Sequence, residues 1–526
     1  MNRRHFVQAA TGAALAAQIS SGEDATPSED CDVFVYGSTP GGLAASIEAA
    51  RRGCRVILAC PKNHAGGMTA SGLCTTDAVR QHLFGGLVIE FINGVHEDYL
   101  REIGENSPDW PSIREGWFYE PSVAERVFDR MLEAEAEQLT FLRGHHLLSC
   151  ETEAANISSV TIEAQNGMER SIRAKTFIDG TYEGDLAAAA KVPYRVGREG
   201  RDEFGESLAG IHYMDWKKGE QIMTPDTGEP SPAIQAFCAR SIFTDDPEKL
   251  VPLEKPENYE QHLSDLLPLL DDFASGRVRR CTLGSKLARG KYQLNGSIIR
   301  HTSINCPGVS WTWPEADRHH RSRLEKFHVD HAASYAWFLQ NDSRVPSEIR
   351  ALWKTAGLHR DEFPDNRHWP WQIYVRQGRR IEGRARVTQH NFILDEKTGR
   401  TPAVPHSIAI GEHSFDVHPC HDRRFIVDGW MEGVLWYPKK ASGPAQPGQV
   451  PYGAMLPKNL DNLLVPVALS STHIAMSVLR MEPLWMTTGQ IAGLAAAEAK
   501  EKSTEVANVD PDSLPEQLEI QVDPYL

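Results

Sequence analysis

The sequence lacks several features that would place it in common classes of protein. After the N-terminus no apolar run approaches the roughly 18 residues that cross a bilayer, so we expect no membrane span. Nine cysteines are scattered through 526 residues without a C-x-x-C pair, which predicts no disulfide framework. Histidines cluster at 319–328 and 418–421, but not at zinc-binding spacing, so we predict no metal. Positive charge is scarce too: a formal net charge of −16 argues against nucleic acid or anionic membranes as partners.

The N-terminal segment, residues 1–30, differs from the rest of the chain. Arg3 and Arg4 precede Phe6 and an alanine-rich, mildly apolar stretch at 9–18, and residues 20–29 are polar and acidic. This pattern resembles a twin-arginine export signal followed by a linker. We therefore expect an exported protein, periplasmic or extracellular. The alternative is an unprocessed flexible tail.

The first informative motif begins at Asp32. An apolar run to Tyr36 ends in a glycine-rich turn, and an alanine-rich segment without helix breakers follows. This order predicts a strand, a tight turn at Gly37 and a helix from about Gly41, where free N–H groups and the helix dipole can bind a pyrophosphate. Thr39 stands where the G-x-G-x-x-G pattern has its middle glycine, so a simple strand-to-helix connection is the alternative interpretation.

The next segment predicts a second parallel strand, residues 54–59, and then a loop that contains Gly66, Gly67 and Gly72. Glycines without a Cβ let the backbone of such a loop pass close to a bulky ligand. Cys60 stands where dinucleotide folds carry the acidic residue that binds the ribose, and a thiol is a poor acceptor. Lys62 or Asn63 is expected to hold the adenosine half instead; otherwise this half binds more weakly, or the site is degenerate.

Two later segments complete the pattern. Residues 174–186 read as a short buried strand that ends in a Gly/Asp turn, after a hairpin predicted at Asn166-Gly167. Near the C-terminus a strand leads to a loop and then to a helix that begins at or just after Pro483. Gly489 and Gly493 share one face of this helix, and we expect that face to pack close to the sheet.

Together these segments resemble the FAD-dependent oxidoreductase family with the glutathione-reductase-type FAD fold, from about Asp32 to about Glu498. The resemblance implies an α/β fold: a Rossmann-like, three-layer FAD-binding domain with a parallel sheet plus a β-meander, and a large inserted α+β substrate domain. It also implies FAD as the cofactor. The residues expected to hold FAD are Gly37, Thr39, Pro40, Gly41, Gly42, Cys60, Gly66, Gly67, Met68, Asp179, Gly180, Thr181, Asp185, Asp461 and Gly489.

The predicted domain organisation follows changes of composition. Residues 31–192 are assigned to the first part of the FAD-binding domain, with a helical insertion at 77–140 that includes a capping box at Ser122 and Glu125. Residues 193–449, rich in Pro, Trp and Gly, form the substrate domain, with a long helix over 316–340. Residues 450–500 form the second part of the FAD-binding domain, and 501–526 form an acidic tail.

Five residues are candidates for the chemistry. His473, in the loop before the last helix, has an ordinary pKa near neutrality and is a candidate base or a structural histidine. Arg480 and Glu482 are candidates for orienting the substrate and accepting a proton, or for an ion pair at a helix start. Tyr374 and Arg376 alternate along a predicted strand and can line a site for a carboxylate or polyol, or lie at a solvated strand end.

The predicted function is oxidation of a small organic molecule, hydroxyl- or sugar-like, by hydride transfer to FAD. The sequence carries no second dinucleotide fingerprint, so O₂, a quinone or a protein is expected as the electron acceptor. Two alternatives stay open. One is a carbohydrate-processing lyase or hydrolase with a structural or redox-silent FAD, and the other is a non-catalytic protein with a degenerate flavin site.

Overall fold

The computed structural model describes residues 28–215, 220–222, 227–296, 302–421, 430–436 and 445–525. The expected export signal lies outside the described residues. The first strand, β1 (Ser28–Tyr36), begins inside the segment assigned to the linker. No helix in the described ranges combines the length and apolarity that a bilayer crossing requires.

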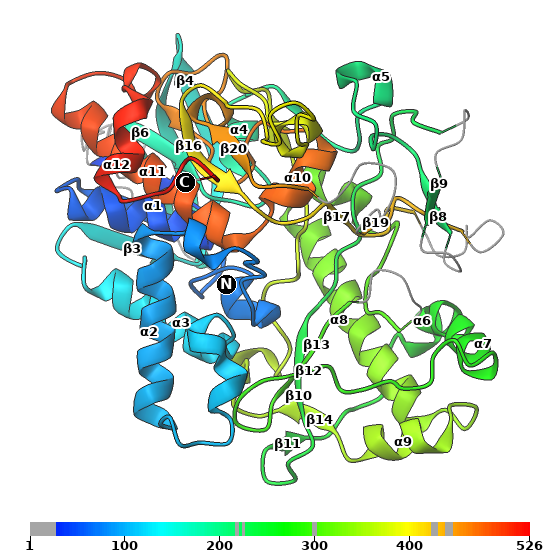
Figure 1. Cartoon of the computed structure of the whole chain (residues 1–526). Coiled ribbons are helices and arrows are strands. Elements are labelled where there is room, and N and C mark those ends of the chain that lie inside the picture. The colour runs from blue at the N-terminus through cyan, green and yellow to red at the C-terminus, as the bar shows by residue number, and fades with distance from the viewer. Residues whose placement is uncertain are drawn as a thin grey trace, which may run out of the picture.

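The largest sheet among the described residues has seven strands, with β1 at its centre between β2 (Val56–Cys60) and β6 (Glu169–Asp179), both parallel to it. Two more parallel strands extend it, β3 (Leu139–Arg143) beside β2 and the late β21 (Leu463–Leu464) beside β6. Strands so distant in sequence meet because their apolar residues are buried on both faces, as parallel sheets require. The late strand β21 therefore joins strands from the first third of the chain in one sheet. The two coloured ends of the chain, blue and red, lie together in the fold (Figure 1).

A β-meander gives the sheet its second layer. Strands β4 (His145–Glu153), β5 (Asn156–Ala164) and β6 pair antiparallel in sequence, with the turn expected at Asn166-Gly167 between the last two. Alternate residues of β1 face different layers: Val33 and Val35 join the helical core, whereas Phe34 and Tyr36 join the core beneath the meander. The predicted fold, parallel sheet plus meander in three layers, is confirmed.

The helical layer consists of α1 (Pro40–Arg51) and α11 (Glu482–Glu501), which pack against each other. A Cβ added at Gly489 would lie 2.0 Å from the carbonyl oxygen of Gly41, and one at Gly493 would lie 2.3 Å from that of Ala45. The expectation that these glycines face the sheet is wrong. They allow the backbones of two helices to touch instead.

The insertion between β2 and β3 contains two helices, α2 (Gly86–Glu102) and α3 (Pro121–Glu133), near their expected places. The capping box at Ser122 is wrong, because the N-cap residue of α3 is Glu120, two residues before Ser122. Ser122 instead donates its hydroxyl and its backbone N–H to Glu362, 240 residues away, at 2.8 and 3.0 Å.

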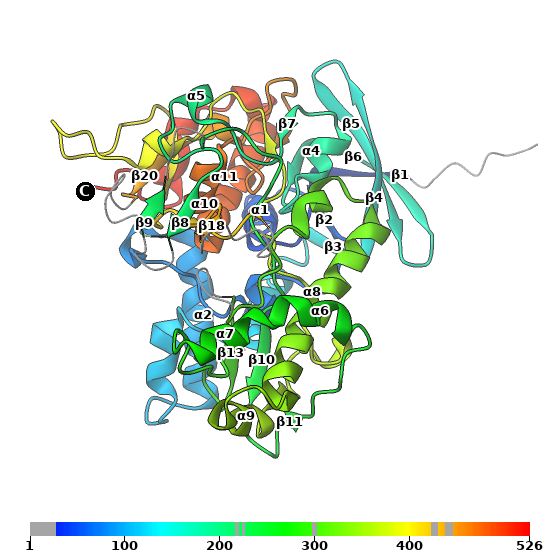
Figure 2. The ribbon, with the colours of Figure 1, turned by 90° about the vertical axis from the view of Figure 1, so that its right-hand side faces the viewer.

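The segment assigned to the substrate domain forms a five-stranded sheet of order β11-β14-β10-β13-β12 beside the long helix α8 (Arg318–Asn341), which runs from the main sheet toward α9 (Figure 2). The strand expected around Tyr374 is reduced to one bridge with Cys238, so that prediction is wrong. The domain boundaries stay predictions. The bounds of this sheet and its helices are β10 (Ser241–Thr244), β11 (Leu250–Val251), β12 (Ser285–Lys286), β13 (Tyr292–Leu294), β14 (Gly357–His359), α6 (Tyr259–Leu266), α7 (Pro268–Ala274) and α9 (Ser347–Lys354).

Shorter elements complete the described structure. They are α4 (Asp185–Ala189), α5 (Arg201–Phe204), α10 (His473–Leu479) and α12 (Leu514–Gln517), with β7 (Tyr194–Arg195) paired to β15 (Arg380–Ile381), β16 (Ser407–Gly411) to β20 (Gly448–Pro451), β17 (Asp416–Val417) to β19 (Leu435–Trp436), and β8 (Tyr213–Asp215) to both β9 (Glu220–Ile222) and β18 (Trp430–Glu432).

The α1–α11 contact predicts a steric effect of a single methyl group. Replacing Gly489 by Ala should lower the free energy of unfolding by at least about 2 kcal/mol, because the new Cβ meets a backbone oxygen that cannot rotate away. Gly94→Ala is the matched control, since its Cβ would meet only the Val127 side chain, at 2.8 Å. Thermal and urea denaturation measure both, and equal loss in the two variants contradicts the interpretation.

Candidate functional site

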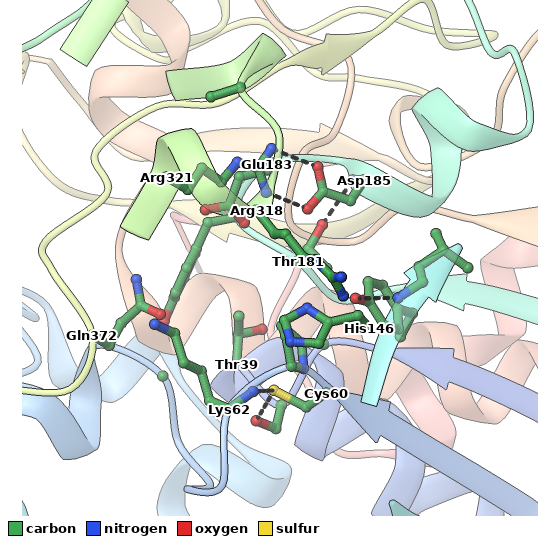
Figure 3. Close-up of a pocket in the computed structure, with 18 of the residues that line it drawn as sticks. Thr39, Cys60, Lys62, His146, Thr181, Glu183, Asp185, Arg318, Arg321 and Gln372 are labelled. Carbon is green, nitrogen blue, oxygen red and sulfur yellow. Dashed lines mark hydrogen bonds and ion pairs between the residues drawn. The ribbon is translucent and has the colours of Figure 1, made fainter. Parts of the chain in front are cut away.

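A cavity of about 440 Å³ opens at the carboxyl ends of β1, β2 and β6. Its floor contains Gly37 and Thr39, which follow β1, and Cys60, the last residue of β2. The opposite wall carries Asp185 and Arg321, on α4 and α8 (Figure 3). A crevice at the carboxyl ends of parallel strands is where open α/β sheets bind their ligands.

Close backbone approach shapes the floor. Gly37 has a φ of +107°, a conformation that favours glycine, and a Cβ there would lie 2.7 Å from Gly180. A Cβ at Gly42 would lie 1.9 Å from the carbonyl oxygen of Gly37, and one at Gly180 would lie 2.6 Å from the Cα of Gly42. Three glycines from two motifs thus touch, and no side chain stands between them.

Thr39 has a defined role at the position where a glycine is usual. It is the N-cap residue of α1, whose hydroxyl accepts from the Gly42 N–H at 3.2 Å and donates to the Gly180 carbonyl at 2.6 Å. Pro40 occupies the first helical turn, where its missing N–H is not needed. The Thr39 side chain is therefore turned toward β6, and the N-terminus of α1 remains directed at the cavity, which Thr39 lines.

Cys60 lines the cavity at the position expected for an acidic residue. Its sulfur accepts from the hydroxyl of Ser38 at 2.9 Å and from the N–H of Lys62 at 3.4 Å. Lys62 also lines the cavity and pairs with Glu325 of α8 at 2.6 Å, whereas the Asn63 carbonyl binds Arg143. Of the two neighbours expected to replace the carboxylate, the structure places Lys62 in position.

The turn after β6 is organised by Asp179, which is completely buried. Its carboxylate accepts from the N–H and hydroxyl of Thr181 and from the N–H of Ala187, and burial raises its pKa to about 6. All these partners are internal, so Asp179 holds the turn. Thr181 and Asp185 line the cavity.

The wall formed by α4 and α8 is charged. Asp185 accepts from Arg321 at 2.5 and 2.8 Å and from Arg379 at 2.9 Å. Burial raises the pKa of Asp185, but the two guanidinium groups outweigh burial and hold that pKa below its ordinary value. Trp313 donates to the buried Glu183 beside them at 2.9 Å. No local pattern marked Arg321 as a residue of this wall, because its partner Asp185 lies 136 residues away in the chain. Arg379 lies in the arginine-rich segment around Arg376.

The loop of Gly66, Gly67 and Met68 contacts the side chain of Tyr182, which lies three residues after the end of β6. A Cβ at Gly67 would lie 2.2 Å from the Tyr182 hydroxyl, which accepts from the Met68 N–H at 2.8 Å. That hydroxyl donates to Glu482, at the start of α11, at 2.6 Å. Tyr182 lines the cavity and Glu482 lies one hydrogen bond behind it. Tyr182 lies within residues 174–186, but neither its residue type nor its spacing marked it as a site residue.

Glu482 is buried, and its surroundings favour the neutral form of its carboxyl. Burial raises its pKa to about 8, and the hydrogen bond from Tyr182 offsets only part of that shift. Its second oxygen, Oε2, has no partner among the described residues. The expected ion pair with Arg480 does not form: Arg480 pairs with Asp416 at 2.5 Å.

The remaining predicted residues lie apart from the cavity wall, and all of them are within the described ranges. His473 is buried at the start of α10 and bonds Gln377 at 2.8 Å; burial, Arg198 and Arg380 lower its pKa well below the ordinary value. Tyr374, Arg376 and Arg480 form a separate buried cluster. Asp461 lies at the surface, paired with Arg384 at 2.5 Å, and Gly489 lies in the α1–α11 contact.

Within the described parts of the chain, no three His, Cys, Asp or Glu side chains gather as a metal site would require. His418 bonds Asn305 at 3.0 Å, and the Cys420 thiol bonds the His418 carbonyl at 3.5 Å. All nine cysteines are free.

The fold and the cavity define an α/β protein with a crevice at the switch of strand order beside β1, the place where such folds bind dinucleotides. Comparison with known families identifies it further: a model of the FAD dependent oxidoreductase family matches residues 32–518. The chain belongs to that family. By family it is an FAD-dependent oxidoreductase. No protein among the curated sequences matches it.

Several solved structures show a distant likeness. Among them are the L-proline dehydrogenase from P. horikoshii (13% identity over 36% of this chain and 27% of that one, TM-score 0.20) and the anhydrotetracycline hydroxylase from Streptomyces rimosus (12%, 43% and 41%, TM-score 0.24). A third is the thioredoxin reductase of T. acidophilum (18%, 28% and 34%, TM-score 0.17). This chain spans 27% to 41% of the length of these proteins. At these TM-scores the likeness bears on neither activity nor substrate.

The residues around the cavity fit FAD. At the glycine contact of Gly37, Gly42 and Gly180 no side chain covers the backbone at the start of α1, where the positive end of the helix dipole attracts phosphate. The cavity volume lies within the usual range for cofactor sites. We expect the Thr39 end to hold the pyrophosphate, Lys62 and His146 the adenosine side, and Tyr182 with Gly67 the flavin side.

The hydroxyl of Thr39 should matter more than its bulk. Thr39→Val should weaken FAD binding about tenfold, because the Gly180 carbonyl and the Gly42 N–H lose the partner that shapes the floor. Thr39→Ser keeps the hydroxyl and should bind like the wild type. Titration of the apoprotein with FAD, followed by flavin fluorescence, gives both affinities. A valine variant with unchanged affinity would exclude this role.

Proposed function

We propose that the enzyme oxidises a small hydroxyl-bearing organic molecule, which loses a hydride to FAD and a proton to the protein. The observation that carries this proposal is the Tyr182–Glu482 pair: a buried carboxyl of raised pKa, linked through one short hydrogen bond to a tyrosine in the cavity wall. Bound FAD supplies the hydride acceptor. The protein's part is to position the substrate and to take its proton.

Glu482 suits proton transfer because burial brings the pKa of its carboxyl close to neutral pH. With a pKa of about 8 the carboxyl is mostly protonated at pH 7, and its carboxylate form increases with pH. A base with such a pKa can take a proton from the substrate through Tyr182 and release it to water afterwards. His473, the other predicted base, lies outside the cavity wall and has a lowered pKa, so we assign it a structural role.

A hydroxyl- or sugar-like substrate is proposed from the cavity's lining. Trp313 and Trp371 both line it, and Trp371 stacks on His64 with ring centroids 4.6 Å apart. Aromatic faces suit sugar rings. For re-oxidation we propose O₂, a quinone or a protein acceptor, and the net charge of −16 favours small molecules over nucleic acid as partners.

Export is proposed from the N-terminal residues alone. Arg3 and Arg4 before an alanine-rich stretch support a twin-arginine signal that carries the folded flavoprotein across a membrane. Changing both arginines to lysine should retain the full-length chain inside the cell, as cell fractionation and FAD content of each fraction would measure. Undiminished export of that variant would refute the proposal.

Flavin reduction tests the activity directly. Under anaerobic conditions the substrate should bleach the flavin absorbance, whereas turnover without bleaching would favour a lyase or hydrolase with a redox-silent FAD. The candidate substrates to be tested are alcohols, sugars and hydroxy acids. The colour and the released FAD of the purified protein establish first that the sample is loaded.

The rate of that bleaching should depend on Glu482. We expect the rate to rise about tenfold between pH 7 and pH 9, as the carboxylate forms, and to level off above the pKa. Glu482→Gln should slow reduction at least about 100-fold and abolish the pH dependence, because the amide cannot accept the proton.

Glu206→Gln is the matched control. Glu206 is also buried with a raised pKa, caused by burial, but it bonds Thr472 and Gln389 instead of the cavity wall. Its pH profile should match the wild type. If the profile of Glu482→Gln is unchanged as well, the proton passes by another route.

A further inference from the structure

Three buried arginines surround Tyr374, next to the flavin cavity. Arg240, Arg376 and Arg480 are 5%, 0% and 3% exposed. The Cζ atoms of Arg240 and Arg376 lie 3.9 and 4.6 Å from the centre of the Tyr374 ring. Arg480 donates to the Tyr374 hydroxyl at 3.2 Å. One aromatic side chain therefore contacts three guanidinium groups in a water-excluded region.

The negative charge around these arginines is insufficient. Asp416 pairs with Arg480 at 2.5 Å and is the single carboxylate within ion-pair distance of any of the three among the described residues. Asp77 attracts Arg240 only from a longer distance. His418 lies beside Asp416, but burial and Arg376 lower its pKa to about 3, so it is neutral.

Hydrogen-bond donors in the cluster are unsatisfied as well. Nε and Nη1 of Arg240 and the Nε atoms of Arg376 and Arg480 are buried without a partner in the described structure. Arg376 reaches only neutral groups, the Ala236 carbonyl and the Cys238 sulfur. Burial lowers its pKa, and Arg480 and Arg240 lower it further. Such desolvated, mutually repelling cations are costly unless an anion joins them.

Other buried arginines of this chain are paired. Arg198 binds Glu432, and Arg380 binds Glu199 at 3.0 Å, all four side chains being almost fully buried. The fold thus supplies a carboxylate where an arginine is purely structural. The cluster around Tyr374 departs from that rule.

The cluster adjoins the flavin side of the cavity through one loop. Gly67, at one end of that loop, lines the cavity, and a Cβ at Gly72, near its other end, would lie 2.2 Å from the Arg240 carbonyl oxygen. Ser71 between them accepts from the N–H of Gln372, another residue of the cavity wall, at 3.0 Å. Tyr374 follows two residues later.

We propose that Arg240, Arg376 and Arg480 bind a carboxylate of the substrate, which makes the substrate a hydroxy acid, sugar acids included. This inference rests on the proposed function and specifies its substrate class. Guanidinium groups bind carboxylates through paired, charge-assisted hydrogen bonds. The bound carboxylate supplies the negative charge that the cluster lacks, and its hydroxyl-bearing carbon extends toward Tyr182 and the flavin side.

The experiment compares two ligands of equal shape and different charge, acetate and acetamide, on the FAD-loaded protein at constant ionic strength. Acetate should perturb the flavin absorption spectrum saturably and raise the melting temperature, because it binds the folded state. Acetamide should do neither. This comparison needs no variant, so it is decisive even if a substitution in the cluster prevents folding. Equal effects of both ligands, or no effect of acetate, would overturn the proposal.

Variants then locate the site. Arg240→Met should raise the dissociation constant of acetate at least about tenfold, and Arg240→Lys, which keeps the charge but loses the planar fork, should give an intermediate value. Arg279→Met is the matched control, because Arg279 is exposed and lies outside the buried cluster. The acetate affinity of this variant should equal that of the wild type. Equal acetate affinity in Arg240→Met and the wild type would show an adventitious ion only and overturn the assignment.

The two proposals fail in different ways. If an uncharged alcohol bleaches the flavin while acetate has no effect, the hydride-transfer proposal stands and the carboxylate site is overturned. If acetate binds in an Arg240-dependent manner but no hydroxy acid bleaches the flavin, the site is supported and the hydride-transfer proposal is overturned. Weaker FAD binding in Arg240→Met, with unchanged acetate affinity, would assign the cluster to the flavin itself and overturn the carboxylate site.

Discussion

The contact between the β1–α1 turn and the end of β6 is the constraint on which the rest of the site depends. Gly37, Gly42 and Gly180 bring two backbones together without an intervening Cβ, and the Thr39 hydroxyl closes the contact from the side. Because this contact fixes the start of α1, it fixes where a phosphate can bind. It also fixes Tyr182, two residues beyond Gly180, and through Tyr182 the position of Glu482. One backbone contact thus relates the cofactor site to the proton-transfer pair.

The buried ionisable groups on the two sides of the loop from Gly66 to Gly72 have different charge states. At Glu482 burial favours the neutral form, and none of the described residues places a cation close enough to reverse that effect. At the Tyr374 cluster the guanidinium groups remain charged despite burial, because an arginine is effectively always protonated. A molecule that is anionic at one end and carries an ionisable hydroxyl at the other matches both environments. This agreement between two independent parts of the site is the strongest argument for a hydroxy acid.

The sequence could predict those helices, strands and turns that depend on residues close together in the chain. The strand, turn and helix at Asp32–Arg51, the Asn166-Gly167 hairpin and the long helix α8 follow from short patterns, and the structure has them. The family and its cofactor were predicted from the resemblance of these segments to a known family. Thr39, judged as a departure from the glycine pattern, proves to be a helix cap, a role that the same segment already allowed.

What the sequence could not predict depends on partners distant along the chain. Ser122 was expected to cap its own helix, but Glu362, brought near by the fold, competes for its hydroxyl. Arg480 and Glu482 are neighbours in sequence yet face different partners, Asp416 and Tyr182. Arg240 gave no signal, since a single arginine in a loop is indistinguishable from a solvated one until its burial is known.

The net negative charge of the protein opposes the binding of an anionic substrate at the proposed carboxylate site. A chain with a net charge of −16 repels an organic anion at long range, although salt screens that repulsion beyond about 8 Å at physiological ionic strength. The affinity for an anionic substrate must therefore arise at short range, from groups that water and salt do not reach. Arg240, Arg376 and Arg480 satisfy that condition because they are buried. Exposed lysines or arginines at the cavity mouth would be screened, and they would attract anions without selecting among them. Burial of the arginines thus gives selectivity for a carboxylate of the right shape, at the cost of an unfavourable cluster whenever the site is empty.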